Sequence, residues 1–313
     1  MKILIAGGAG FIGSNLTSSH LQKKDEVVVI DNLITGSEKN IDEFKLDKNF
    51  QFIKADIVTF DFTSLSTFDI VYHLASPASP PQYQKYSIET LQTNSLGTNN
   101  LLDFFRKSKS RTFVFTSTSE IYGDPLVHPQ IETYFGNVNS VGPRSCYDEG
   151  KRFAEALCMA YVRKYYLNIR IARVFNTYGP KMEKIDGRAV SNFITQALTH
   201  KPITIYGDGS YTRSFCYVSD MVEGLMRLAA KKNVGGEIVN LGNPCEKSIL
   251  YLAMMINKLT ESRSVITHLP TPVDDPKRRK PDITKAKSIL RWSPKMPLKT
   301  GLKKTIEYFR KIV

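Results

Sequence analysis

Lys2-Ile3-Leu4-Ile5-Ala6-Gly7-Gly8-Ala9-Gly10-Phe11-Ile12-Gly13 is the stretch that decides the fold of this chain. Its apolar first part predicts a buried strand over residues 2–6, and a helix is expected from residue 11 to residue 23. The glycines between them permit a tight turn, a close approach of the backbone to a pyrophosphate, and close packing of the helix. Because the free N–H groups at the start of a helix attract anions, this turn predicts a dinucleotide site.

A second apolar run, Val27 to Ile30, predicts the next strand, and Asp31 follows it directly. A carboxylate at this place accepts hydrogen bonds from ribose hydroxyls and repels a 2′-phosphate. The pattern therefore favours NAD over NADP. The alternative is a structural glycine turn with an unrelated surface aspartate, and it does not account for strand, turn, helix and acid occurring together.

The rest of the first half alternates between apolar runs and segments with helical periodicity. Strands are expected at residues 50–53, 69–74, 112–116 and 169–174, and helices at residues 88–106 and 146–166. Continuous apolar runs are typical of parallel strands that are buried on both faces. The order of the elements predicts an α/β fold with a doubly wound parallel sheet of the Rossmann-like kind.

Beyond about residue 176 the regular alternation ends, and prolines interrupt the chain repeatedly. We expect residues 1–175 to form an NAD-binding Rossmann domain. Residues 176–313 are expected to form a smaller C-terminal lobe that binds the substrate over the carboxyl ends of the strands. A strand near residues 236–242 is expected to return to the sheet.

The composition is that of an ordinary globular protein, with 42% hydrophobic and 23% charged residues in a chain of 313. No apolar run approaches the roughly 20 residues that span a bilayer, so no membrane partner is expected. No signal peptide is recognisable, which favours the cytoplasm. The four cysteines have no CxxC spacing, and we expect reduced thiols and no metal site.

The net charge of +13 is concentrated near the C-terminus. Residues 277–313 contain 13 Lys or Arg, against Asp282 and Glu307 as the only acids. Such a region either attracts an anionic partner or forms a solvated, lysine-rich surface. We favour the solvated surface for most of these charges and expect no nucleic-acid partner.

Tyr147 and Lys151 are four residues apart in a segment with helical periodicity, so their side chains share one face. A phenol with its ordinary pKa of about 10 is a poor base at neutral pH, but a nearby ammonium lowers that pKa. Such a tyrosine can remove a hydroxyl proton while a hydride passes to NAD⁺. This spacing is common by chance, but behind a dinucleotide turn it favours a catalytic pair.

Thr118, Ser119 and Glu120 follow the strand predicted at residues 112–116, at the edge of the sheet where ligands bind. Thr118 and Ser119 are candidates to hydrogen-bond the reacting hydroxyl or the tyrosine. Glu120 is a candidate to orient a sugar or to relay a proton. The alternative is a hydroxyl-rich turn that only caps a helix.

These segments resemble the extended short-chain dehydrogenase/reductase family, whose members act on nucleotide sugars. The matching motifs are GGAGFIG (7–13), HLAS (73–76), TSTSEIYGDP (116–125), YDEGK (147–151) and RVFNTYGP (173–180). The resemblance is closer to one branch, the UDP-glucuronate decarboxylases, and covers residues 1 to about 310. The branch-specific segments are HLASPASPPQY (73–83), GPRSCYDEGKR (142–152), DGRAVSNFI (186–194), RSFCYVSD (213–220), VNLGNP (239–244) and DDPKRRKPDI (274–283).

The resemblance implies a role for each motif residue. Tyr147 is implied as the base and Lys151 as its helper, while Thr118, Ser119 and Glu120 complete the catalytic residues. The implied substrate contacts are Asn176, Tyr206, Arg213 and Arg279. The implied cofactor contacts, besides Tyr147 and Lys151, are Gly7, Gly10, Phe11, Ile12, Gly13, Asp31, Asn32, Gly36, Asp56, Ile57, Leu74, Ala75 and Thr93.

The resemblance also implies an activity: decarboxylation of UDP-glucuronate to UDP-xylose through a transient 4-keto intermediate, with internally recycled NAD and a homodimeric enzyme. Two alternatives remain open, a decarboxylase that releases the UDP-4-keto-pentose and an NAD-dependent UDP-sugar 4-epimerase. A 4,6-dehydratase is disfavoured because Ser119 occupies the place of the first acid of its usual pair. A non-catalytic dinucleotide-binding protein is disfavoured because both Tyr147 and Lys151 are present.

Overall fold

A seven-stranded, wholly parallel sheet lies at the centre of the protein, for which a computed structural model describes all residues 1–313. The doubly wound fold predicted from the sequence is confirmed, and the predicted strands are present with small differences at their ends. In spatial order the strands are β11 (Ile238–Leu241), β6 (Ile169–Val174), β5 (Thr112–Thr118), β4 (Ile70–His73), β1 (Lys2–Ala6), β2 (Glu26–Asp31) and β3 (Phe50–Lys54).

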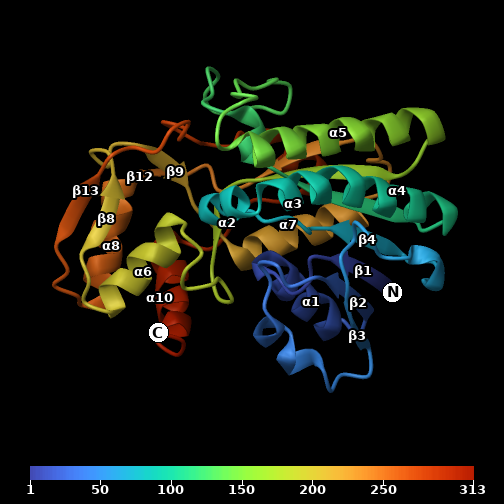
Figure 1. Cartoon of the computed structure of the whole chain (residues 1–313), viewed down its shortest axis with the longest axis horizontal. Coiled ribbons are helices and arrows are strands. Elements are labelled where there is room, and N and C mark those ends of the chain that lie inside the picture. Colours follow the sequence, from blue (N-terminus) through green and yellow to red (C-terminus); the bar gives the residue numbers. More distant parts are fainter.

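Helices cover both faces of the sheet, as Figure 1 shows. On β1, Ile3 and Ile5 face one hydrophobic core while Leu4 and Ala6 face the other, because successive side chains of a strand point to opposite sides. The first core includes α1 (Phe11–Gln22) and α7 (Val218–Ala230), and the second includes α4 (Thr98–Lys107) and α5 (Ser145–Tyr165). Burial on both faces explains why these strands read as continuous apolar runs.

The helix predicted at residues 88–106 is interrupted. The structure has α3 (Ser87–Gln92), a π-helical turn at Thr93–Gly97, and then α4. A Cβ at Gly97 would lie only 2.7 Å from Cδ1 of Ile57, so this turn packs closely on the segment after β3. Residues 88–106 contain no proline that would mark the interruption, which is why the sequence predicted a single helix. Such π turns frequently occur at functional sites.

The second part of the chain is more regular than the sequence suggested. It contains α6 (Ala189–Leu198), α8 (Ile249–Thr260), α9 (Thr284–Leu290) and α10 (Leu298–Phe309). Short strand pairs join them: β8 (Ile203–Tyr206) with β13 (Ile266–Leu269), β9 (Thr212–Ser214) with β12 (Glu246–Ser248), and β7 (Thr177–Tyr178) with β10 (Cys216–Tyr217). Four elements face the carboxyl end of the main sheet: α2 (Pro80–Lys85), α6, β8 and β9 (Figure 1). No helix of the protein is both long enough and apolar enough to cross a membrane.

A buried polar network ties two distant segments to the edge of the sheet. Asn240 of β11 is fully buried, and its amide donates to the carbonyls of Gln130 and Asp282 and accepts from the Tyr122 hydroxyl. The backbone of Gln130 pairs in turn with the segment around Pro281. Asn240 therefore joins the turn after β5 to the segment that contains Arg279.

Candidate active site

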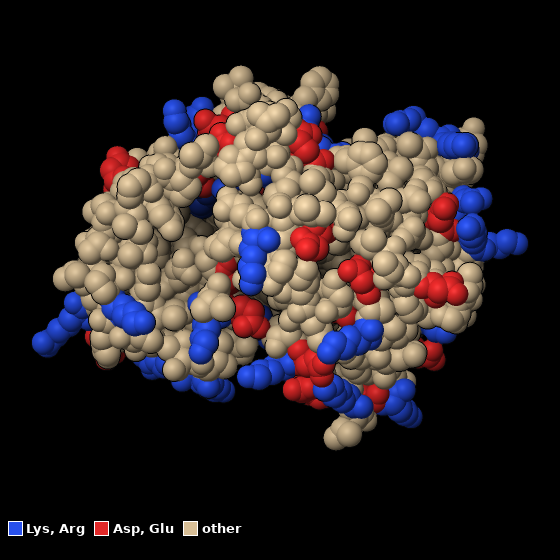
Figure 2. All heavy atoms as spheres, viewed as in Figure 1, with Lys and Arg blue, Asp and Glu red and all other residues tan.

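The main cavity lies at the carboxyl ends of the central strands and has a volume of about 600 Å³. Figure 2 shows a recess in this face of the molecule. Most of the residues predicted from the sequence line it: Gly7, Gly10, Phe11, Ile12, Gly13, Leu74, Thr118, Ser119, Glu120, Tyr147, Lys151, Asn176, Tyr206 and Arg213. A smaller cavity next to it, which shares Gly7, Gly10 and Leu74, is lined by the other predicted cofactor residues: Asp31, Asn32, Gly36, Asp56, Ile57, Ala75 and Thr93.

The glycine turn leaves space where a pyrophosphate would bind. A Cβ at Gly7 would lie 2.5 Å from the backbone nitrogen of Ala75, and a Cβ at Gly13 would overlap the carbonyl of Gly7. Gly10 differs, because its only neighbour within 4 Å would be the Gly7 oxygen at 3.3 Å. Gly10 is also the N-cap of α1, and no side chain caps this helix. The free helix N–H groups and the open space in front of them fit a dinucleotide.

Asp31 is held rigidly at the end of β2. Its two oxygens accept the backbone N–H groups of Ala9, at 3.0 Å, and Leu33, at 2.9 Å. Burial raises the pKa of Asp31, although these two hydrogen bonds act against the rise. Next to it, Asn32 donates to Asp56 at 2.9 Å. Two carboxylates with defined orientations therefore line the smaller cavity, where a ribose and a base would lie.

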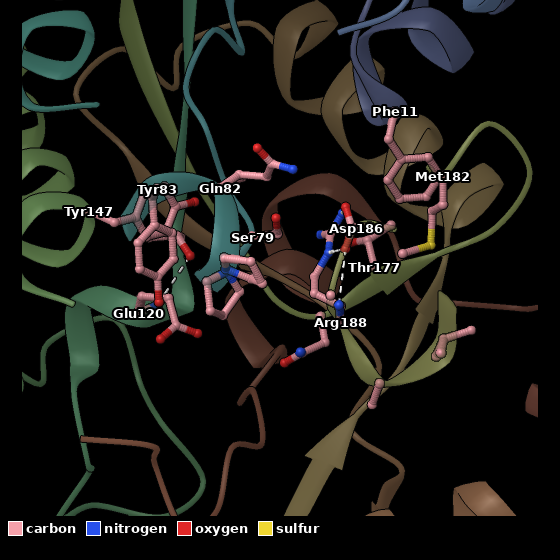
Figure 3. Close-up of a pocket in the computed structure, with 18 of the residues that line it drawn as sticks. Phe11, Ser79, Gln82, Tyr83, Glu120, Tyr147, Thr177, Met182, Asp186 and Arg188 are labelled. Atoms are coloured by element: carbon pink, nitrogen blue, oxygen red, sulfur yellow. Dashed lines mark hydrogen bonds and ion pairs between the residues drawn. The ribbon is translucent and has the colours of Figure 1, made fainter. Parts of the chain in front are cut away.

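Tyr147 and Lys151 share one face of α5, as their spacing predicted. The Lys151 ammonium lies 5.9 Å from the centre of the Tyr147 ring and donates to the carbonyl of Thr116 at 2.9 Å. The ring of Tyr83 stacks on that of Tyr147, with centroids 5.0 Å apart and an angle of 2° between the planes. Figure 3 shows the two tyrosines together at one side of the cavity. The base candidate on α5 is thus packed against Tyr83 of α2.

Burial has the largest effect on the pKa values of Tyr147 and Lys151. It raises the pKa of Tyr147, and a polar contact with Thr118 only partly opposes that rise. Burial also lowers the pKa of Lys151 to about 7. The Tyr-Lys spacing predicts that the lysine charge lowers the tyrosine pKa, but burial of Tyr147 has the larger effect and raises it. A buried ammonium is costly because the single hydrogen bond to the Thr116 carbonyl replaces only part of its hydration.

A cluster of arginines surrounds Glu120, in the turn that follows β5. Arg279 donates to the Glu120 carboxylate at 2.7 Å and to the Ser119 hydroxyl at 3.0 Å, and Arg144 pairs with the other oxygen of Glu120. Burial alone would raise the pKa of Glu120, but the Arg279 and Arg144 charges outweigh it and hold this pKa at about 2. Glu120 is therefore a carboxylate at neutral pH.

The predicted substrate residues differ in their positions. Asn176, Tyr206 and Arg213 line the main cavity. Arg279 is only 1% exposed, lies behind Ser119 and Glu120, and is not part of the cavity wall. Its contact with a substrate stays a prediction, whereas its contact with two of the predicted catalytic residues is direct.

The cavity is also lined by residues for which the sequence predicted no role. They are Tyr83, Arg144, Arg188 and Asp275. Arg188 forms a bidentate pair with Asp186, which Figure 3 shows on the wall opposite the tyrosines. All four fall within motifs quoted above, but only the fold reveals which motif positions face the cavity. Within DDPKRRKPDI (274–283), nothing in the sequence distinguishes Asp275 from the adjacent Asp274.

Comparison with known proteins identifies the family of this chain. The sequence profile of the NAD dependent epimerase/dehydratase family matches residues 3–242. The chain belongs to this family. It is 51% identical over 310 residues to UDP-glucuronic acid decarboxylase 1 of Xenopus tropicalis, covering 99% of this chain and 72% of the relative. It is 49% identical over 313 residues to UDP-glucuronic acid decarboxylase 4 of Arabidopsis thaliana, covering 100% of this chain and 69% of the relative.

Solved structures of this family have the same fold. The UDP-glucuronic acid 4-epimerase of Bacillus cereus, in complex with UDP-glucuronic acid and NAD, superimposes with a TM-score of 0.91 at 32% identity, over 100% of both chains. The UDP-glucose 4-epimerase of Thermotoga maritima, with UDP-glucose, also has a TM-score of 0.91 at 31% identity, over 100% of this chain and 99% of that chain.

The glycine turn yields a paired prediction. Gly10→Ala is expected to fold normally, because the Gly10 backbone is in the extended region (φ −75°) and the new methyl meets no atom closer than 3.3 Å. The methyl occupies the phosphate space, so NAD affinity is expected to fall at least about tenfold. Gly13→Ala is expected to lower the melting temperature, because its methyl overlaps the Gly7 carbonyl. Titration with NAD and thermal melts test both variants, and undiminished NAD binding by Gly10→Ala would contradict the assignment.

Lys151 makes stability depend on pH. Its folded pKa of about 7 lies below the ordinary value of about 10.5, so between these values the unfolded chain binds a proton that the folded protein does not. The lysine's contribution to the unfolding free energy therefore rises with pH across this window, by at most about 1.4 kcal/mol per unit. Urea unfolding of the protein without added NAD, compared with Lys151→Met from about pH 7 to pH 10, measures this slope. Equal slopes for the two proteins would show that the lysine keeps its proton.

Proposed function

We propose that this protein is an NAD-dependent UDP-glucuronate decarboxylase that forms UDP-xylose. The strongest support is the identity of about half of all residues, over nearly the whole chain, to enzymes named UDP-glucuronic acid decarboxylase. In the structure, the observation that carries the proposal is the arginine cluster around Glu120, next to the Tyr147–Lys151 pair. An oxidation site with an excess of guanidinium groups suits a sugar that carries both a diphosphate and a carboxylate.

The substrate itself explains why an oxidation site is needed. Loss of CO₂ from C5 of the sugar would leave a carbanion with no stabilisation. When C4 is a ketone, the C6 carboxylate is β to it, and the electron pair of the breaking C5–C6 bond enters an enolate. A proton is then added at C5, and reduction of C4 completes UDP-xylose. NAD, when bound, accepts the C4 hydride and returns it, so the reaction has no net redox change.

We assign the proton transfer at C4 to Tyr147, which removes the hydroxyl proton and later returns it. Thr118 is placed to hydrogen-bond the same oxygen, because it contacts Tyr147 and lines the cavity. Lys151 is placed to hold the nicotinamide ribose and to stabilise the phenolate. Because Glu120 is ionised, we assign it to orienting the sugar rather than to donating a proton. Ser119, fixed by Arg279, is assigned to the sugar as well.

The nucleotide end of the substrate is assigned to the lobe side of the cavity. Arg213 and Arg144 supply the positive charge there, and Asn176 and Tyr206 supply polar contacts. We assign the dinucleotide to the glycine turn and the smaller cavity, where Asp31 accepts hydrogen bonds from the adenosine ribose. The full set of predicted cofactor residues, from Gly7 to Thr93, surrounds this path.

Two related activities compete with this assignment. A 4-epimerase uses the same oxidation at C4 but retains the carboxylate, and a solved 4-epimerase with UDP-glucuronic acid has this fold at 32% identity. The higher identity to decarboxylases, 49–51%, favours loss of CO₂. The other alternative releases the UDP-4-keto-pentose before C4 is reduced.

We further propose a cytoplasmic homodimer in which residues 1–175 bind NAD and residues 176–313 bind the nucleotide sugar. The dimer proposal is supported by exposed apolar side chains on the adjacent helices α3 and α5 and the π turn between α3 and α4, namely Ile88, Leu91, Leu96 and Phe153. Such a patch on a helical face is typical of a surface that another chain covers. Sedimentation equilibrium tests this point, and the mass of a single chain would contradict it.

Incubation with UDP-glucuronate and NAD, followed by product identification by mass spectrometry and NMR, tests the proposed activity. We expect CO₂ and UDP-xylose without accumulation of NADH. Tyr147→Phe is expected to lose at least about a hundredfold in turnover, the usual scale for a general base, while still binding NAD. Recovery of UDP-galacturonate would establish the epimerase, and a 4-keto sugar with an equal amount of NADH would establish the releasing decarboxylase. Near-normal turnover by Tyr147→Phe would overturn the assignment of the base.

A further inference from the structure

Asp275 places a carboxylate of the chain itself between two arginines of the cavity. Both of its oxygens accept from Nη2 of Arg213, each at 3.1 Å, and one of them lies 3.5 Å from Nη1 of Arg144. All three residues line the main cavity. The space between the two guanidinium groups is therefore occupied by an anion that belongs to the protein.

The two arginines are held in place from elsewhere. Arg213 is in β9, which pairs with β12, and its Nη1 donates to the carbonyl of Thr212. Arg144 is paired with Glu120 and lies over the Tyr83 ring, 5.9 Å from its centre. Neither depends on Asp275 alone for its position, so removal of the Asp275 charge leaves both arginines in the cavity.

Asp275, unlike Arg213, lies in a segment without regular secondary structure. Residues 270–277 form no helix or strand, and the neighbouring Val273 and Asp274 are exposed. The Asp275 side chain itself is 24% exposed, against 12% for Arg213 and 8% for Arg144. A carboxylate on such a segment can leave the arginines without breaking a helix or a strand.

The charges of this group favour a diphosphate over the Asp275 carboxylate as the partner of the two arginines. Arg144, Arg213 and Arg279 face two carboxylates, Glu120 and Asp275, so this group has a net charge of +1. Withdrawal of Asp275 makes the net charge +2 and exposes two guanidinium groups to the same point. A diphosphate is more negative than one carboxylate and has more acceptor oxygens, so it is the better partner for two guanidinium groups.

We propose that Asp275 sets the affinity of the site by competing with the nucleotide diphosphate for Arg144 and Arg213. This inference rests on the proposed function, in that the cavity takes a UDP-sugar. A ligand must displace the Asp275 carboxylate on entry, and the same carboxylate replaces the ligand when the product leaves. The opposite role, a carboxylate that orients the arginines for the ligand, requires that its removal weaken binding.

Asp275→Asn tests the proposal in the full chain, with UDP as the probe. Titration calorimetry is expected to give a Kd for UDP about tenfold lower than that of the parent protein, with slower dissociation in stopped-flow experiments. Asp274→Asn is the matched control. It makes the same charge change one residue away, where the carboxylate accepts from Asn139 and pairs with no arginine. Its Kd is expected to stay within about twofold of the parent's, because an exposed charge acts only through a screened field.

Unchanged or weaker UDP binding by Asp275→Asn would overturn the proposal, as would equal tightening in both variants. Asp275→Ser provides a second variant without the charge, and thermal melts confirm that each protein is folded. Failure of the parent protein to bind UDP at all, with NAD binding intact, would instead refute the proposed function. The two failures are therefore distinguishable.

Discussion

The parallel ladder of β1, β4 and β5 is the constraint on which the rest of the site depends. Its strands run in one direction, so their carboxyl ends lie at the same edge of the sheet. The glycine turn, the segment after His73, and Thr118 are therefore close together there. Tyr147 and Lys151 of α5 line the same cavity as the glycine turn. A shift of one residue in this register would exchange the two cores, because alternate side chains of β1 belong to opposite faces.

Paired charged side chains at this edge of the sheet determine which ligands suit the site. Glu120 is ionised because the Arg279 and Arg144 guanidinium groups outweigh its burial. Both arginines pair with Glu120, and Arg144 also pairs with Asp275. Buried charges of this kind are stable only as a mutually paired set, since each unpaired member would bear its full cost of desolvation. The set as a whole has one net positive charge, and four of its members, Glu120, Arg144, Arg213 and Asp275, line the same cavity as Tyr147 and Lys151.

The fold was predictable because its signals are local. The apolar runs, the glycine turn at Gly7–Gly13 and the acid at Asp31 each report on a few consecutive residues, and the structure confirms the strands they predict. The π turn at Thr93–Gly97 was missed because no proline in residues 88–106 marks a break in the helix. The short strand pairs β8–β13 and β9–β12 were missed because their partners are far apart in sequence and lack long apolar runs. In the site, the sequence motifs predicted most of the residues that line the cavity. The burial of Arg279 and the pairing of Asp275 with Arg213 depend on tertiary contacts, which the sequence does not reveal.

The central claim is that C4 of the sugar is oxidised and then reduced within one binding event. UDP-glucuronate with deuterium at C4, incubated with the enzyme and unlabelled NAD, tests this directly. The account predicts that NMR finds the deuterium at C4 of the UDP-xylose formed, because the hydride that leaves is the hydride that returns. Deuterium in free NADH, or hydrogen at C4 of the product, would contradict it.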